Sequence, residues 1–242
     1  MNKLANSFYI YGISILFFLT QSLGVEAQAS VLNQYGLDII RTKNEYYNSI
    51  KNKPGNKMID LKEKINGIAF DLRYATKNNF MGVKLYPSIT TTYLRNTAAM
   101  ALDSVQSALQ QKGLGIKIFD TYRPYSITEK MWELVKDDRY AANPKYGSGH
   151  NRGIAVDVTI IDLKTKIPLD MGTGFDNFSD TAHHSFKNLS TEILQNRMLL
   201  KTVMEKYGFK ALETEWWHYA LPNAKDYELM DVGFSDLKKI TR

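Results

Sequence analysis

The residues of this sequence that are best suited to metal binding or catalysis are its histidines and the acidic residues that accompany two of them. The chain contains four histidines in 242 residues. His150 ends a glycine-containing segment, and Asp157 follows within a run of alternating apolar residues that predicts a strand. Glu215 and His218 lie together in a second strand-like segment near the C-terminus. Two histidines and one carboxylate are the donor set of a catalytic zinc that keeps a fourth position for water.

This pattern predicts that His150, Asp157 and His218 bind one Zn²⁺ and that Glu215 is the general base. Glu215 is a spare carboxylate close to the metal, placed to take a proton from a water molecule there. Asp157 supports this interpretation, because a carboxylate within an apolar strand is costly unless a cation or hydrogen bonds satisfy it. The spacing alone leaves structural roles open, since the interval from His150 to Asp157 is not a standard zinc motif.

The elements that must position these residues predict an α+β fold. The 154–161 strand places Ala155, Asp157 and Thr159 on one face and its branched residues on the other. A capping-box spacing begins a helix at Ser126. The expected elements are strands over 68–74, 116–120, 154–161 and 209–221, helices over 95–111, 126–136 and 191–207, and a loop over 137–149. We therefore expect a single α+β domain with a central antiparallel sheet that is flanked by helices and carries the zinc site.

Composition narrows the class of protein. Hydrophobic residues make up 44% of the chain and aromatic residues 12%, which is typical of a globular protein. The sequence has no cysteine, which excludes disulfides, thiolate metal sites and a cysteine nucleophile. The net charge of +6 is spread along the chain without a long basic run. This pattern favours a solvated basic surface, and we expect no nucleic-acid partner.

The N-terminal residues 1–29 have the pattern of a secretory signal peptide. Lys3 provides a basic start, an apolar run covers residues 9–19, and Ala27 and Ala29 provide small residues at a cleavage point. The apolar run is shorter than the roughly 20 residues that span a bilayer. An uncleaved N-terminal anchor is the alternative interpretation. We expect cleavage, no stable membrane insertion afterwards, and a protein exported to the periplasm or secreted.

The rest of the chain divides into two expected parts. Residues 30–57 are polar and rich in Asn and Lys, and they predict a loosely attached lead-in segment. Residues 58–242 contain all the expected elements and all the candidate site residues, and they form the expected zinc-binding domain.

Several motifs together carry a resemblance to a known family. The first is Ser148-x-His150-x-x-Gly153-x-Ala155-x-Asp157, and the second is Glu215-Trp216-Trp217-His218. With the segments at residues 71–76, 120–124 and 171–176, they resemble the D-alanyl-D-alanine dipeptidase family, within the wider group of zinc D,D-carboxypeptidases and wall endopeptidases. The resemblance covers residues 68–221. It implies zinc-dependent hydrolysis of a small D-amino-acid dipeptide, D-alanyl-D-alanine, in cell-wall peptide turnover.

The resemblance also implies roles for residues to which spacing alone assigns no function. Arg123 matches the family's arginine that stabilises the oxyanion of the tetrahedral intermediate, which suits the rule that fixed positive charge stabilises developing negative charge. Asp176 and Tyr74 resemble the residues that hold the free amino group of the substrate. Ser148 is expected either to contact the substrate or to shape the loop before His150. His183 and His184 match positions that are not metal ligands.

Two alternatives stay open at this point. Residues 137–146 form a shorter segment than the family pattern implies, and a different loop there could admit longer peptides. The chain could then be a D,D-carboxypeptidase or a peptidoglycan endopeptidase. A non-catalytic peptidoglycan-binding module is the alternative of a different class, and the complete set of ligands, base and arginine argues against it. The sequence implies no particular oligomeric state.

Overall fold

The computed structural model describes residues 32–51 and 53–241. The expected signal peptide lies outside these residues, so export and cleavage stay predictions. Among the described residues, no helix combines the length and the apolar character that crossing a bilayer requires.

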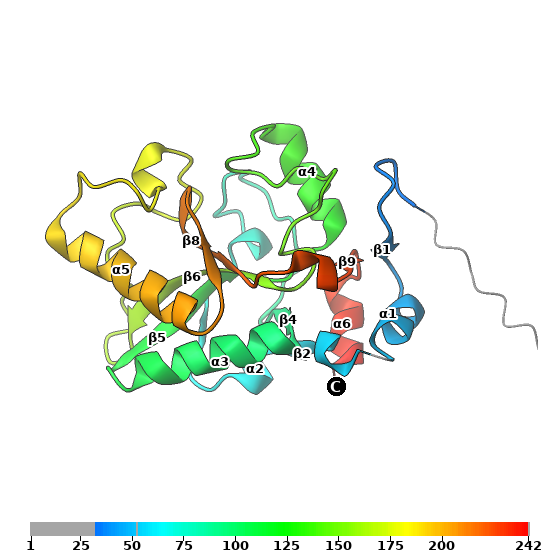
Figure 1. Ribbon diagram of the computed structural model, residues 1–242, viewed down its shortest axis with the longest axis horizontal. Coiled ribbons are helices and arrows are strands. Elements are labelled where there is room, and N and C mark those ends of the chain that lie inside the picture. Colours follow the sequence, from blue (N-terminus) through cyan, green and yellow to red (C-terminus); the bar gives the residue numbers. More distant parts are fainter. Residues whose placement is uncertain (1–31, 52, 242) are drawn as a thin grey trace, which may run out of the picture. The chain divides into compact units, whose positions relative to one another are not determined.

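Helices and short strands alternate along the described chain (Figure 1). The strands are β1 (Ile39–Ile40), β2 (Met58–Asp60), β3 (Ala69–Phe70), β4 (Tyr93–Arg95), β5 (Leu114–Asp120), β6 (Ala155–Asp162), β7 (Lys210–Leu212), β8 (Glu215–Ala220) and β9 (Leu229–Met230). The α-helices are α1 (Lys43–Ile50), α2 (Leu61–Lys64), α3 (Asn96–Gln110), α4 (Tyr125–Leu134), α5 (Thr191–Lys206) and α6 (Phe234–Ile240). Single turns of 3₁₀-helix are η1 (Pro54–Asn56), η2 (Arg73–Ala75), η3 (Asp180–Ala182) and η4 (Ala224–Asp226).

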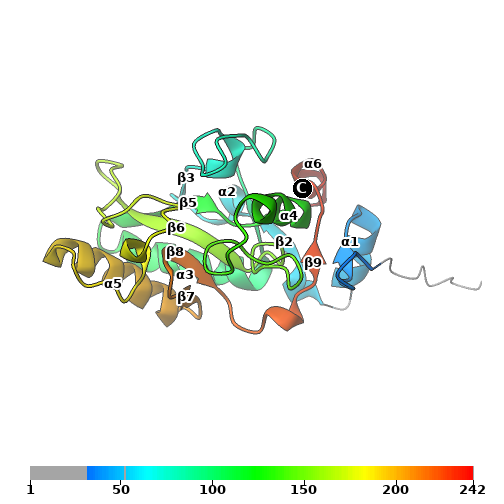
Figure 2. The same ribbon diagram turned by 90° about the horizontal axis from the view of Figure 1, so that it is seen from above.

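A five-stranded sheet forms the centre of the fold, with the strand order β3-β5-β6-β8-β7 (Figure 2). Strands β5, β6, β8 and β7 pair antiparallel, as predicted, while the short edge strand β3 joins β5 in parallel. Two smaller pairs, β1 with β9 and β2 with β4, complete the strand pairings in the described chain. The predicted α+β class and the central sheet flanked by helices are therefore confirmed.

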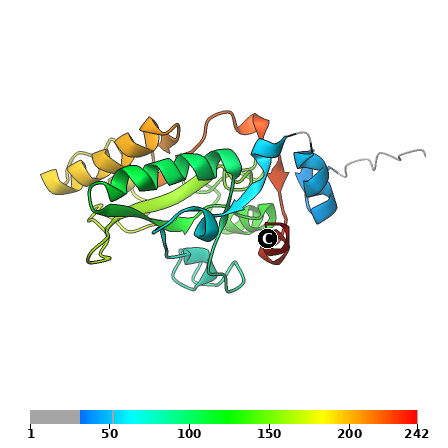
Figure 3. The same ribbon diagram turned by 90° about the horizontal axis from the view of Figure 1, so that it is seen from below.

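The sheet buries one face against helices. Helices α3 and α5 lie side by side on that face, seen from below in Figure 3, and α4 lies on the opposite side (Figure 1). Along β6, the branched residues Val156, Val158 and Ile160 join the main hydrophobic core together with Leu102 and Val105 of α3. Because side chains alternate across a strand, Asp157 projects from the other face of β6, as the sequence predicted.

Two expected elements differ from the structure at their edges. The strand predicted over 68–74 ends at Phe70, and the chain then turns through η2, which brings Tyr74 towards the site. Helix α4 begins at Tyr125, but the predicted capping box does not form. Ser126 instead donates its backbone N–H and its hydroxyl to Asp231 Oδ1, at 2.9 and 2.8 Å. A distant carboxylate therefore satisfies the start of this helix in place of the local Glu129.

The expectation of a loosely attached lead-in over 30–57 is wrong for residues 39–51 and 53–57. Helix α1 begins with a capping box between Thr42 and Glu45, and β1 pairs in parallel with β9 near the C-terminus. Tyr46 is fully buried in the main core, and its hydroxyl accepts a hydrogen bond from the backbone N–H of Met58 at 2.7 Å. The polar composition concealed this packing, because one buried aromatic residue is enough to attach a short helix to the core.

Candidate metal centre and substrate cavity

His150 is fixed by the loop that precedes β6. The loop packs tightly against the sheet, since a Cβ atom on Gly149 would lie 2.9 Å from the Cβ of Ala155. Glycine at one position and alanine at the other therefore allow this close approach. The His150 Nδ1 atom lies 2.6 Å from the carbonyl oxygen of Thr121, so this nitrogen donates its proton to that carbonyl. The Nε2 atom then faces the site, and it is the nitrogen that a neutral imidazole with this tautomer offers to a metal.

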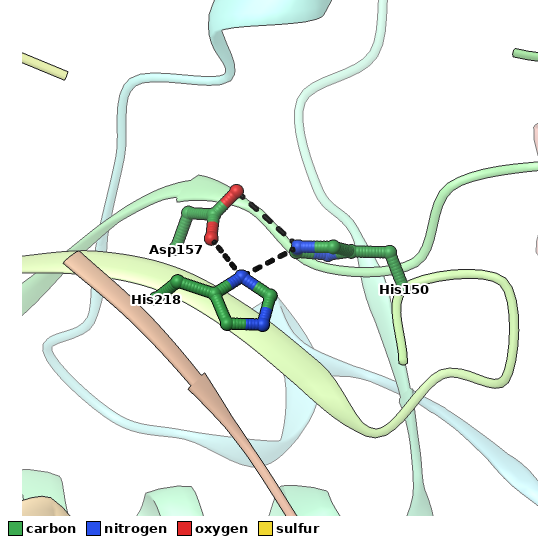
Figure 4. Close-up of side chains that lie close together, drawn as sticks. All are labelled: His150, Asp157 and His218. Carbon is green, nitrogen blue, oxygen red and sulfur yellow. Dashed lines mark hydrogen bonds and ion pairs between the residues drawn. The ribbon is translucent and has the colours of Figure 1, made fainter. Parts of the chain in front are cut away.

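Asp157 and His218 lie directly opposite each other on the paired strands β6 and β8. Opposite residues in an antiparallel pair project from the same face, and this pairing brings the two side chains together. The Asp157 Oδ1 atom lies 2.9 Å from His218 Nδ1, and its Oδ2 atom lies 3.4 Å from His150 Nε2. The two histidine nitrogens are 3.2 Å apart, and Figure 4 shows all three groups converging on one point.

These three side chains fit a zinc ion. One possible ligand atom from each side chain lies within 4.8 Å of the others. Among the described residues, this is the one group of three or more such side chains close enough together to hold a metal ion. Burial acts to raise the pKa of Asp157, but the two histidines outweigh it and leave the pKa well below its usual value. Asp157 is therefore ionised, as a metal ligand must be. Neutral imidazole nitrogens and one carboxylate are the donors of a catalytic zinc site.

Glu215 begins β8 and lies beside this cluster without joining it. Its Oε2 atom is 3.9 Å from His218 Nδ1, and the side chain is largely buried. Burial raises the pKa of Glu215 well above its usual value, and the negative charges of Asp157 and Asp176 raise it further. A divalent cation at the cluster would oppose this shift, because it would offset the repulsion between the carboxylates.

Arg123 is held rigidly at the cavity wall. Its Nε and Nη2 atoms donate to Asp120 Oδ2 at 3.0 and 2.9 Å, and its guanidinium carbon lies 5.1 Å from the ring centre of Tyr74. The Nη1 atom makes no hydrogen bond to any residue of the described chain. Asp120 also accepts a hydrogen bond from Tyr86 at 2.9 Å. A charge-assisted pair of this kind fixes the orientation of a guanidinium.

Asp176 and Tyr74 form a second polar group in the cavity. The Tyr74 hydroxyl donates to Asp176, with distances of 3.0 and 3.2 Å to the two carboxylate oxygens. Burial, and then the charge of Asp157, raise the pKa of Asp176 from 3.8 to about 7. Its backbone has a φ of 58°, in the left-handed region that few non-glycine residues adopt. Such a conformation usually marks a position that the surrounding structure dictates.

The structure brings all eight predicted site residues to one cavity of about 240 Å³. They are Tyr74, Arg123, Ser148, His150, Asp157, Asp176, Glu215 and His218. Ser148 also shapes the loop before His150, because its hydroxyl accepts a hydrogen bond from the backbone N–H of Asn151 at 3.2 Å. His183 and His184 lie outside the ligand cluster, and burial lowers the pKa of His184 to about 4.

The sequence interpretation missed several residues of the site. Asp120 and Tyr86 hold Arg123, and the carbonyl of Thr121 orients His150. Asp120 stands three residues before Arg123 in a motif that was noted, so this spacing was the available signal. Phe80 and Tyr140 also line the cavity, and neither was assigned a role from the sequence, because they come from loops far apart along the chain.

A buried cluster of two histidines and a carboxylate, with a second carboxylate and a fixed guanidinium beside it, defines a metallohydrolase site. Comparison with known proteins gives the family. Residues 54–240 match the family described as D-ala-D-ala dipeptidase, of the peptidase M15 type, and the chain belongs to this family. It is accordingly a metallopeptidase, and zinc is the cofactor that its donor set fits.

Two curated relatives share much of the sequence. The chain is similar to a D-alanyl-D-alanine dipeptidase of Escherichia coli, with 34% identity over 178 residues, which cover 74% of this chain and 91% of the relative. It is 30% identical over 185 residues to one of Enterococcus faecalis, covering 69% and 92%. Among solved structures, a zinc complex of the D,D-pentapeptidase VanY has 15% identity and a TM-score of 0.35, and covers 56% of this chain and 76% of that one.

Proposed function

We propose that this metallopeptidase hydrolyses the free dipeptide D-alanyl-D-alanine. The observation that carries the proposal is the convergence of a candidate metal cluster, a spare carboxylate, a guanidinium and the buried carboxylate of Asp176 on one cavity. The cavity volume of about 240 Å³ lies below the roughly 300–1,000 Å³ of sites for drug-sized ligands. A small substrate suits this size, and the dipeptidase activity named for the relatives supports the choice of dipeptide.

The substrate is oriented by charge at its amino end. The carboxylate of Asp176 would bind the free ammonium group, and the Tyr74 hydroxyl keeps that carboxylate in place through the bonds described above. An ammonium placed there would also lower the raised pKa of Asp176, since opposite charges favour the ionised form. Ser148, on the cavity wall, is a candidate for contact with the remainder of the dipeptide.

The chemical step needs a base and a site for negative charge. A zinc ion held by His150, Asp157 and His218 would polarise the scissile carbonyl and make a water molecule a better nucleophile. Glu215 would take a proton from the attacking water and deliver it to the nitrogen of the leaving amine. Arg123 would donate through Nη1 to the oxygen that becomes negative as the carbonyl carbon turns tetrahedral. Its fixed orientation means that little reorganisation accompanies the reaction.

The location proposed for this activity is outside the cytoplasm. The signal-peptide pattern of residues 1–29 supports export, and an exported dipeptidase of this kind would serve cell-wall peptide turnover or nutrient recovery. N-terminal sequencing of the protein from its native host tests this part. We expect the mature chain to begin after Ala27 or Ala29, and a mature chain that still carries Lys3 would contradict cleavage.

A substrate panel tests the activity. Purified protein would be assayed on D-Ala-D-Ala, L-Ala-L-Ala, N-acetyl-D-Ala-D-Ala and a wall pentapeptide, with and without a chelator. We expect activity on free D-Ala-D-Ala that the chelator abolishes and that zinc restores. Equal rates on the free and N-acetylated dipeptides would show that Asp176 does not select a free ammonium, and would favour a D,D-carboxypeptidase or endopeptidase. No hydrolysis of any D-peptide would refute the proposal.

A further inference from the structure

Asp176, whose carboxylate is proposed to bind the substrate's ammonium group, lies in the middle of an irregular stretch of chain. We call residues 171–183, which run between β6 and α5, the Asp176 segment. The segment contains no strand, and its one helical turn is η3. Asp176 lies five residues after Met171 and five before Thr181. A segment with so little regular hydrogen bonding needs fixed points elsewhere if Asp176 is to keep one position.

Arg197 of α5 provides such fixed points at both ends of the Asp176 segment. Its Nε atom donates to the carbonyl oxygen of Met171 at 2.8 Å. Its Nη2 and Nη1 atoms donate to the carbonyls of Thr181 and His183, at 2.9 and 3.2 Å. One planar guanidinium therefore links the start of the segment to its end through three hydrogen bonds. The side chain is 4% exposed, so water does not compete for these bonds.

The chemistry of Arg197 suits this task and little else. All its hydrogen bonds within the described chain go to main-chain carbonyls, and none goes to a carboxylate. Burial lowers its pKa, which means that keeping the guanidinium charged in this position has a cost. Lysine could not replace it, because a point-like ammonium cannot reach three carbonyls that a rigid fork spans.

Further contacts transmit this constraint to Asp176. The ring of Phe175 packs on Phe119, with 4.9 Å between ring centres, and meets Trp217 edge-on at 5.5 Å. The Trp216 Nε1 atom donates to the hydroxyl of Thr173 at 2.8 Å. The segment is thus held at its ends by Arg197 and in its first half by the sheet. The left-handed backbone of Asp176, with a φ of 58°, lies between these attachments.

We infer that Arg197 is a positioning residue for substrate recognition, which acts through Asp176 and never touches the substrate. This inference rests on the proposed function. A carboxylate held ready in its binding position saves the ordering cost that a mobile one would incur on each binding event. Loss of the three Arg197 hydrogen bonds should therefore weaken the binding of the ammonium group and leave the metal cluster and Glu215 unaffected.

A double-mutant cycle tests this coupling. The zinc-loaded wild type, Arg197→Lys, Asp176→Asn and the double variant would be compared on D-Ala-D-Ala. We expect Arg197→Lys to raise KM about tenfold and to change kcat less than about twofold, because the weakened contact is equally strong in the ground state and the transition state. The double variant should have the same kcat/KM as Asp176→Asn alone, within about twofold. If Arg197 acts only by positioning the Asp176 carboxylate, its loss has no further effect once that carboxylate is absent.

A second buried arginine provides a control that separates positioning from general loosening. Arg95 is also fully buried and donates to three carbonyls, those of Asn56, Arg152 and Glu228, and its Nη2 atom lies 3.6 Å from the Glu228 carboxylate as well. Arg95→Lys should lower the melting temperature, as Arg197→Lys does, but leave KM unchanged. If Arg197→Lys does not fold, Arg197→Gln keeps one donor without the buried charge and takes its place.

The outcomes have distinct meanings. The inference would be overturned if the fold-losses in kcat/KM caused by Arg197→Lys and Asp176→Asn multiply in the double variant, because the two residues would then act independently. A wild-type KM in Arg197→Lys, or an equal rise of KM in Arg95→Lys, would overturn it as well. A wild type without activity on D-Ala-D-Ala would refute the proposed function itself, and the inference would fall with it.

Discussion

The sharpest prediction separates proton transfer from metal binding, and it concerns Glu215→Gln. Glutamine keeps the size of the side chain and removes its basicity. The carboxylate of Glu215 lies 3.9 Å from His218 Nδ1 and is not among the three converging donors, so the substitution should leave the zinc site whole. General-base catalysis typically contributes about 10²–10⁴-fold. We therefore expect kcat to fall at least about 10²-fold, which corresponds to about 2.7 kcal/mol of activation free energy.

The assay measures zinc content beside kcat and KM for Glu215→Gln and His150→Ala. Glu215→Gln should retain about one zinc per chain and a nearly unchanged KM, because the ammonium and metal contacts persist. His150→Ala should lose zinc affinity, since it removes one of three protein ligands. Folding of both variants is checked by thermal melting.

Two results would refute the reasoning. If Glu215→Gln loses zinc as badly as His150→Ala, then Glu215 is a ligand and the mechanism must be redrawn. If it keeps both zinc and full activity, another group is the base. In that case the raised pKa of Glu215 would reflect only its burial and the neighbouring charges of Asp157 and Asp176.

Three further predictions follow from the same cavity. Arg123→Ala should keep zinc and lose about 10²–10³-fold in kcat, measured by steady-state kinetics, because the oxyanion loses its fixed donor. Asp176→Asn should stabilise the metal-free protein at pH 8 and not at pH 4: folding raises the pKa of Asp176 from 3.8 to about 7, so the wild type loses stability as the pH rises through that window. Thermal melts at the two pH values test this sign, and an equal effect at both would contradict it. Chelation should lower the melting temperature, and zinc should restore it, because a ligand that binds only the folded state stabilises it.

The fold was predictable where one element carries its own pattern. The alternation along residues 154–161 and the helical periods of 95–111 and 191–207 correspond closely to β6, α3 and α5. The strand expected over 209–221 divides into the hairpin of β7 and β8. The segment 68–74 ended early as a strand, because its pairing with β5 extends over two residues and a 3₁₀ turn then takes over.

The metal cluster was predictable because its chemistry is restricted to few residue types. Only four histidines were available, one of them preceded a carboxylate in an apolar strand by seven residues, and the family resemblance then favoured a metal site over structural roles. The residues that orient the site left a weaker trace. The carbonyl of Thr121 orients His150, and a backbone group has no signature in a sequence. Arg197 gave no signal either, because its role depends on three carbonyls that only the folded loop brings together.

The distribution of charge explains why this cavity should depend on a cation. The carboxylates of Asp157, Asp176 and Glu215 line it, and the buried carboxylate of Asp120 is paired with Arg123 at its wall. The two histidines keep Asp157 ionised, and its charge then helps to raise the pKa values of Asp176 and Glu215. Without a cation, this repulsion favours the protonated forms of those two carboxyl groups. A divalent ion at the cluster and an ammonium group at Asp176 would replace those protons. Glu215, the proposed base, would then be ionised when metal and substrate are both present, which is the state in which the proposed proton transfer takes place.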